Sequence, residues 1–143
     1  MIMRLLQVES SGNFSLTEDY IEHVPPYAIL SHTWGKDTEE VTFDDFRAGG
    51  YTKKTGYRKI QFCGEQAARD GLQHIWVDTC CINKSDYTEL SEAINSMFSW
   101  YRDAAKCYVY LSDVSKRSDA NESFSRSSWK SEFKHSRWFT RAW

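Results

Sequence analysis

Two ionisable side chains, each in an apolar run, are the first candidates for chemistry. His32 closes the run 27–32, and it could contact a phosphate, a ribose or a carbonyl. A histidine that only bonds a neighbouring loop is an equal alternative. Asp78 lies inside the run 75–82, where a carboxylate must be paired or hydrogen-bonded. It could bind a ribose hydroxyl, act as a general base with a raised pKa, or serve as a structural cap.

Further polar and aromatic residues follow the same two runs. Trp34 and Gly35 could give a nucleotide base a stacking wall and a close backbone approach, or form a packed turn. Asn83, Asp86 and Glu89 lie at a loop-to-helix junction, where capping explains them without a ligand. Glu89 is the best carboxylate there for a catalytic acid. The catalytic candidates are therefore Glu89, Asp78 and His32, and the ligand-binding candidates are Ser31, His32, Trp34, Gly35, Asp78, Cys80, Asn83 and Asp86.

The four cysteines have no C-x-x-C spacing, since they lie at positions 63, 80, 81 and 107. This spacing argues against a zinc site, and no metal is expected. Cys80 and Cys81 would point to opposite faces of a strand, so at most one of them faces a pocket. An inert buried thiol is the simpler interpretation. A nucleophilic thiol beside His32 would instead make the protein a Cys-His hydrolase, an alternative function.

Hydrophobic periodicity indicates the elements that carry these residues. Short apolar runs typical of strands buried on both faces lie at 27–32, 75–82 and 107–111, and a shorter strand is expected at 4–8. Helices are expected at 53–70 and 89–104, the second capped by Asp86 or Ser85. Residues 41–46 are ambiguous. Residues 112–131 are polar and Ser-rich, and 133–143 resemble the start of another helix.

This alternation of strands and helices predicts a parallel sheet with helices on both faces. The three apolar strands should be parallel neighbours, with the helix 89–104 packed on one face. Ligands of such sheets bind beyond the carboxyl ends of the strands. Segments 31–35 and 78–86 and the stretch after Leu111 should therefore converge. The prediction is that one concavity is surrounded by His32, Trp34, Asp78 and Asn83.

Composition limits the classes of function. The 143 residues are enough for one domain with its own core, and the formal charge of -2 argues against a general nucleic-acid binder. Residues 116–141 are rich in Lys and Arg, as in a solvated basic flank or a surface for an anionic partner. No apolar run approaches the roughly 18 residues of a membrane span, and the first residues do not read as a signal peptide. With reduced thiols, a cytoplasmic location is expected.

Four sequence blocks in order carry a resemblance to a known family. They read YAILSHTWG at 27–35, WVDTCCINK at 76–84, ELSEAINSMF at 89–98 followed by WYRDA at 100–104, and SRWFTRAW at 136–143. Together they resemble the heterokaryon incompatibility (HET) domains of filamentous fungi. The likeness extends over nearly the whole chain, as a single domain at 1–143. Such domains trigger programmed cell death when genetically different hyphae fuse, and many precede nucleotide-binding receptor regions.

HET domains also resemble TIR domains distantly, which implies a TIR-like or flavodoxin-like three-layer α/β sandwich around a mainly parallel sheet. Several TIR branches cleave NAD with a glutamate four residues after a tryptophan. Trp143 matches that tryptophan and ends the chain, so we expect a domain truncated at its C-terminal end, with little or no NAD hydrolysis. The resemblance implies NAD as substrate and no required cofactor. A non-enzymatic module is the alternative.

The resemblance also implies protein partners. We expect self-association, or contact with other HET or receptor-type signalling proteins, and no membrane or nucleic-acid partner. A nucleotide ligand fits the same picture. The assembly candidates are Trp138 and Trp143.

Overall fold

The computed structural model describes residues 2–111, and it shows an α/β fold around one mixed sheet. The strands are β1 (Leu6–Val8), β2 (Phe14–Leu16), β3 (Ala28–His32), β4 (His74–Trp76) and β5 (Lys106–Tyr110). The helices are α1 (Phe43–Ala48), the 3-10 turn η1 (Tyr51–Lys53), α2 (Tyr57–Arg69) and α3 (Tyr87–Asp103). The described strands are ordered β2-β1-β4-β3-β5. Predictions for the stretch after Leu111, including Trp138 and Trp143, lie outside the described residues.

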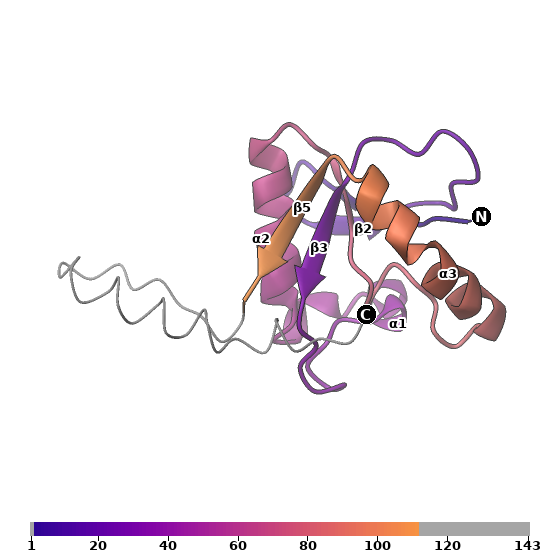
Figure 1. Cartoon of the computed structure of the whole chain (residues 1–143). Helices are drawn as coiled ribbons and strands as arrows, with labels where there is room; N and C mark the ends of the chain where they lie inside the picture. The colour runs from indigo at the N-terminus through magenta and orange to yellow at the C-terminus, as the bar shows by residue number, and fades with distance from the viewer. Residues whose placement is uncertain (1, 112–143) are drawn as a thin grey trace, which may run out of the picture.

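The centre of the sheet is parallel, as predicted. β3 pairs in parallel with β4 on one side and with β5 on the other. In Figure 1 the arrowheads of β3 and β5 point toward the same end of the molecule. The loops that follow β3 and β4 therefore leave the sheet at one edge, which brings segments 31–35 and 78–86 together.

The expectation of a mainly parallel sheet needs correction, because β1 pairs antiparallel with both β2 and β4. The turn between β1 and β2 contains Gly12, whose φ of 86° lies in the left-handed region that favours glycine. This turn folds β2 back on β1 as a short hairpin. The hairpin extends the sheet by antiparallel pairing, so among the described strands the parallel and antiparallel pairings are equal in number.

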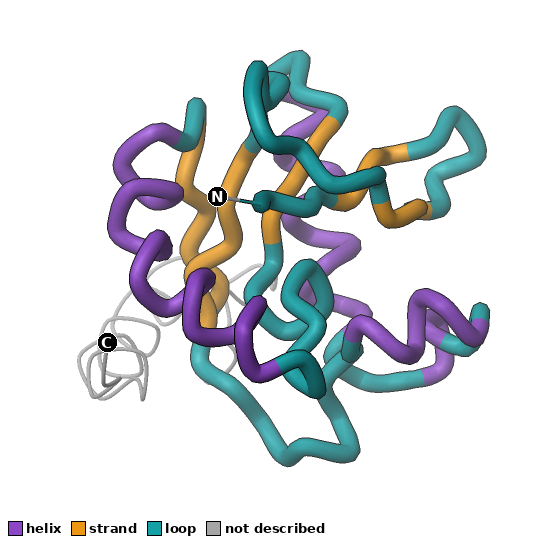
Figure 2. The backbone as a smooth tube through the Cα atoms, turned by 90° about the vertical axis from the view of Figure 1, so that its right-hand side faces the viewer, coloured by secondary structure: helices purple, strands orange, loops and turns teal. Residues whose placement is uncertain are grey.

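Helices α2 and α3 pack on opposite faces of the sheet. Tyr108 and Tyr110 of β5 point toward α2, where Tyr110 packs on the ring of Phe62. Trp76 of β4 points the other way, and its ring contacts Trp100 and Tyr101 of α3. In the perpendicular view of Figure 2 the strands again gather between helical segments. The core therefore lies on both faces of β3 and β4, whose side chains are almost entirely buried.

The predicted strand 75–82 is too long by six residues, because β4 ends at Trp76. The backbone N–H groups of Cys80 and Cys81 both donate to the carbonyl of Val77, which closes a turn. The side chains from Val77 to Ile82 are buried all the same. An apolar run can be buried as a packed turn as well as a strand, so the run alone did not determine the backbone conformation of these residues.

The helices match their predicted segments closely. α3 begins at Tyr87, and its cap is Asp86, whose side chain accepts from the N–H groups of Thr88 and Glu89. α2 is shorter than predicted, since η1 and a turn occupy its first residues. The ambiguous segment 41–46 forms the start of α1, with a capping box between Thr42 and Asp45. Within residues 2–111 no helix is long and apolar enough to cross a membrane.

Candidate functional site

The carboxyl ends of β3 and β4 bring together two predicted site residues in a buried ion-pair network. His32 Nε2 lies 2.8 Å from Asp78 Oδ1, and the indole N–H of Trp34 donates to Asp78 Oδ2 at 2.9 Å. His32 is 1% exposed and Asp78 5%, so the pair is closed to solvent. Both carboxylate oxygens of Asp78 are thus bound to protein donors. The parallel pairing of β3 with β4 is what brings these segments side by side.

Lys59 of α2 continues the network on the other side of His32. Its ammonium lies 3.2 Å from His32 Nδ1, 2.9 Å from the Thr33 carbonyl oxygen and 2.5 Å from Glu40 Oε1. An ammonium has only donors, so His32 Nδ1 accepts and His32 Nε2–H donates to Asp78. This arrangement corresponds to the Nε2–H tautomer of His32. Lys59 and Glu40 are themselves buried, as an ion pair.

The pKa of Asp78 is lowered from its usual value. Burial acts to raise this pKa, but the hydrogen bonds from His32 and Trp34 and the positive charge of Lys84 outweigh it. Asp78 is therefore a carboxylate at neutral pH. The suggestion that the pKa of Asp78 is raised is therefore wrong.

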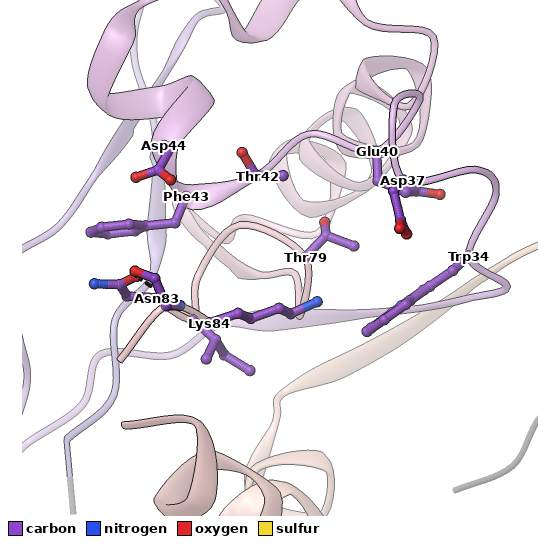
Figure 3. Close-up of a pocket in the computed structure, with 11 residues that line it drawn as sticks. Trp34, Asp37, Glu40, Thr42, Phe43, Asp44, Thr79, Asn83 and Lys84 are labelled. Carbon is purple, nitrogen blue, oxygen red and sulfur yellow. Dashed lines mark hydrogen bonds between the residues drawn. The ribbon is translucent and has the colours of Figure 1, made fainter. Parts of the chain in front are cut away.

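A cavity of about 300 Å³ opens beside this network (Figure 3). Trp34 stands at one end of it and Phe43 with Asn83 at the other, while Thr79 lies between them. The volume is at the small end of the range for ligand sites. The described residues that line it are Trp34, Asp37, Glu40, Thr42, Phe43, Asp44, Thr79, Ile82, Asn83, Lys84 and Ser85.

Lys84 extends across this cavity from the side of Asn83 toward Trp34 (Figure 3). Its Nζ lies 3.7 Å from the centroid of the Trp34 ring, which is a cation–π contact. Burial lowers the pKa of Lys84, although the carboxylate of Asp78 and other anionic groups nearby oppose the shift. Trp34 is 48% exposed and lines the cavity, so its aromatic side chain borders the opening.

The loop after β3 is shaped by hydrogen bonds to Glu40. The backbone N–H of Gly35 donates to Glu40 Oε1 at 2.7 Å, and Lys54 Nζ donates to the Glu40 carbonyl oxygen at 3.1 Å. A Cβ at Gly35 would come within 2.8 Å of Glu39 Oε2. Gly35 thus permits a close approach, as the sequence suggested, but the group that it meets is the protein's own acidic side chain.

Glu89 belongs to a separate cluster at the start of α3. Its Oε1 accepts from Arg4 Nη1 at 2.8 Å and from the backbone N–H of Asn83 at 3.0 Å. Arg4 also pairs with Asp19 at 2.9 Å. Glu89 therefore joins the N-terminal segment to the loop before α3. It does not line the cavity, and neither does Asp86.

Neither Cys80 nor Cys81 is placed to act as a nucleophile beside His32. Cys80 is fully buried, and burial raises its pKa well above the usual value, so the thiol stays protonated at neutral pH. Cys81 is also buried, and its Sγ accepts from the backbone N–H of Val77 at 3.4 Å. This environment disfavours a Cys-His hydrolase. Within residues 2–111 no group of three or more His, Cys, Asp or Glu side chains is arranged to hold a metal ion.

The structure places the sequence-predicted residues in two layers. Trp34 and Asn83 line the cavity, while His32 and Asp78 lie buried behind Trp34. Ser31 is buried in β3 and does not line the cavity. Since β3 alternates its side chains, Ser31 faces the side of the sheet opposite to His32. The roles of these residues in binding stay predictions.

Sequence reasoning missed Glu40, Lys59 and Lys84. Lys59 had a readable signal, because it lies four residues before Cys63 on the buried face of α2. A charged residue on such a face must find a buried partner. Glu40 had no comparable signal, since its segment could not be assigned to an element.

Comparison with known proteins gives the same family that the four sequence blocks resemble. The family model described as "Heterokaryon incompatibility protein (HET)" matches residues 27–130, more than half of the chain. The chain is also 56% identical over 142 residues to the "Vegetative incompatibility protein HET-E-1" of Podospora anserina. This match covers 99% of the chain and 10% of the relative, so the chain spans about a tenth of that protein's length. No solved structure matches.

Proposed function

The chain belongs to the heterokaryon incompatibility (HET) family, and we propose that it acts in fungal nonself recognition as a module that triggers programmed cell death. The name of the Podospora relative supports a role in vegetative incompatibility. Nearly the whole chain aligns with that relative, so the buried network and the cavity belong to the shared region. A cytoplasmic location is part of the same proposal.

We further propose that the cavity beside Trp34 is the ligand site of this module, with NAD as its ligand. The observation that carries this proposal is the position of the cavity, beyond the carboxyl ends of two parallel strands. An exposed aromatic ring at one end can stack a base or a nicotinamide ring. The parallel strands β4, β3 and β5 with helices on both faces support a TIR-like core, to which the β1–β2 hairpin is an addition.

Cleavage of NAD requires a carboxylate beside the ribose to stabilise an oxocarbenium-like transition state. Asp37 and Asp44 line the cavity and have no hydrogen-bonding partner among the described side chains. Asp78 and Glu89 are engaged by protein donors instead. Asp37 and Asp44 are therefore better candidates than Glu89 for such a role within residues 2–111.

Expression in a filamentous fungus tests the proposed function. The chain is produced from an inducible promoter, and cell death is counted with a dye that enters dead hyphae. We expect death with the parent chain and with Ile21→Ala, which changes an exposed apolar residue away from the cavity. Trp34→Ala should lose the response while keeping its circular dichroism spectrum. Equal killing by Trp34→Ala would contradict the assignment of the cavity.

One observation favours self-association as a second candidate function. Tyr87, Ile94 and Phe98 of α3 are 82%, 61% and 77% exposed, and steps of seven and four residues put them on one helix face. An apolar stripe of this kind can pair with a second copy. Light scattering after size exclusion tests this candidate. The parent should form dimers or larger species that Phe98→Ser reduces to monomers.

A further inference from the structure

The charge of the cavity lining points to a positively charged ligand. Among the described residues that line it, Asp37, Glu40 and Asp44 are acidic and Lys84 is the one cation. Glu40 is balanced by its ion pair with Lys59. The negative charges of Asp37 and Asp44 have no such pair among residues 2–111. Phosphate groups would be repelled here, whereas a cation would be attracted.

The ammonium of Lys84 already occupies the position over Trp34 where a cation would be attracted. It lies 3.7 Å above the ring of Trp34 and makes no hydrogen bond or close ion pair within the part of the chain that the structure describes. An ammonium normally uses three donors. Burial lowers the pKa of Lys84 despite the anionic groups around it, so its charge is held less favourably than in water. Lys84 is therefore an internal cation that is weakly held and that a better cation could displace.

The shape of the site favours a small, flat cation. The half-exposed Trp34 offers a planar aromatic ring, and the cavity of about 300 Å³ has room for one ring rather than a whole dinucleotide. A charged aromatic ring combines stacking with the cation–π attraction that Lys84 now supplies. Asp37 and Glu40 lie on the same side of the cavity as Trp34 and can face its positive charge (Figure 3).

We propose that Lys84 is a built-in competitor at a site for a planar organic cation of the N-alkylpyridinium class, which stacks on Trp34 after the lysine side chain has moved away. This inference rests on the proposed function, because it names the part of the ligand that the cavity receives. By competing with the ligand, Lys84 raises the ligand concentration at which the site becomes occupied.

Isothermal titration calorimetry with two small probes tests the proposal. The probes are 1-methylnicotinamide, a monocation, and nicotinamide, its neutral counterpart. Lys84→Met keeps most of the length of the side chain but removes its charge, and Lys106→Met is the matched change at an exposed position on β5, away from the cavity. We expect Lys84→Met to bind the cation about tenfold more tightly than the parent, or ~1.4 kcal/mol. Lys106→Met should leave the affinity unchanged.

The neutral probe distinguishes the effect of removing the positive charge of Lys84 from the effect of the space that the substitution opens. Nicotinamide should gain less than about twofold from Lys84→Met, because it meets no repulsion from the ammonium. Equal gains for both probes would overturn the proposal, as would unchanged or weaker binding of the cation. Adding Asp37→Asn to Lys84→Met should weaken cation binding by about threefold, the effect of one nearby surface charge.

Failure of this inference is distinguishable from failure of the proposed function. If Trp34→Ala abolishes cell death while Lys84→Met does not alter cation binding, the inference is refuted and the cavity remains the site. If Lys84→Met binds the cation more tightly but Trp34→Ala still kills, the cation site stands and the proposed function of the cavity fails.

Discussion

The replacement Lys59→Met tests the buried network most severely. Lys59 donates to Glu40, to the Thr33 carbonyl and to His32 Nδ1, and its side chain is about as buried as that of Glu40. Methionine fits the same space but donates nothing. The variant leaves the Glu40 carboxylate buried without its cation, and it leaves His32 Nδ1 without its donor.

The expected loss follows from these contacts. Removing one partner of a buried ion pair costs about 3–5 kcal/mol, because the other charge stays behind. Glu40 keeps the N–H of Gly35 as a donor at 2.7 Å, which puts the loss near the lower limit. We therefore expect Lys59→Met to lower the free energy of unfolding by ~3 kcal/mol. For a chain of this size that corresponds to about 6–12 °C in Tm.

Urea unfolding followed by circular dichroism and tryptophan fluorescence measures this loss. Lys53→Met is the matched control, because Lys53 is exposed in η1, and it should change stability by no more than about 0.5 kcal/mol. The double variant Lys59→Met/Glu40→Gln should lose less than the sum of the two single variants, with a coupling of at least about 1 kcal/mol. A loss under about 1 kcal/mol for Lys59→Met, or simple additivity, would refute the network as described.

Three further predictions concern stability and thiol reactivity. The pKa of Asp78 is lowered in the folded protein, so its carboxylate adds stability above its unfolded pKa of about 4, and this stability is lost as the pH falls through the folded pKa. Asp78→Asn should therefore flatten the dependence of the urea midpoint on pH between about pH 5 and pH 2. An unchanged slope would count against the pair with His32. In Gly64→Ala the new Cβ would lie 2.5 Å from the buried ring of Phe14, so calorimetry should show a loss of about 1–3 kcal/mol in the free energy of unfolding. A stabilised variant would contradict the packing of the Phe14 ring of β2 against α2. At neutral pH a thiol reagent should modify the exposed Cys107 first, because burial raises the pKa of Cys80 and slows its reaction. Fast labelling of Cys80, detected by peptide mapping, would instead support the Cys-His hydrolase alternative.

The sequence predicted the centre of the sheet well, for a simple physical reason. The runs at 27–32 and 107–111 are short and apolar, and both are strands shifted by at most one residue at each end. The run at 75–82 misled the prediction, because a buried turn with hydrogen bonds to Val77 has the same composition as a buried strand. The short hairpin of β1 and β2 carries too little periodicity to show that it would pair antiparallel with β4.

The candidate site was predicted only where strands end. His32 and Asp78 could be placed near each other in advance, because parallel strands bring their carboxyl ends to one edge, but their direct pairing and their burial behind Trp34 were not predicted. Lys59 and Glu40 come from a helix and a loop that reach the same point by tertiary packing, and a single sequence does not show such contacts. The position of Lys84 over Trp34 likewise depends on how the loop after β4 turns.

The most direct test of the account is an NMR titration of NAD into the chain labelled with nitrogen-15 at tryptophan. The indole N–H signal of Trp34 can be assigned by its loss in Trp34→Phe, and it reports on the hydrogen bond to Asp78 and on the ring that borders the cavity. If the cavity is the ligand site, this signal shifts saturably as NAD is added, while the signal of Trp76, buried in the core, moves little. A Trp34 signal that stays unchanged at millimolar NAD would contradict the account.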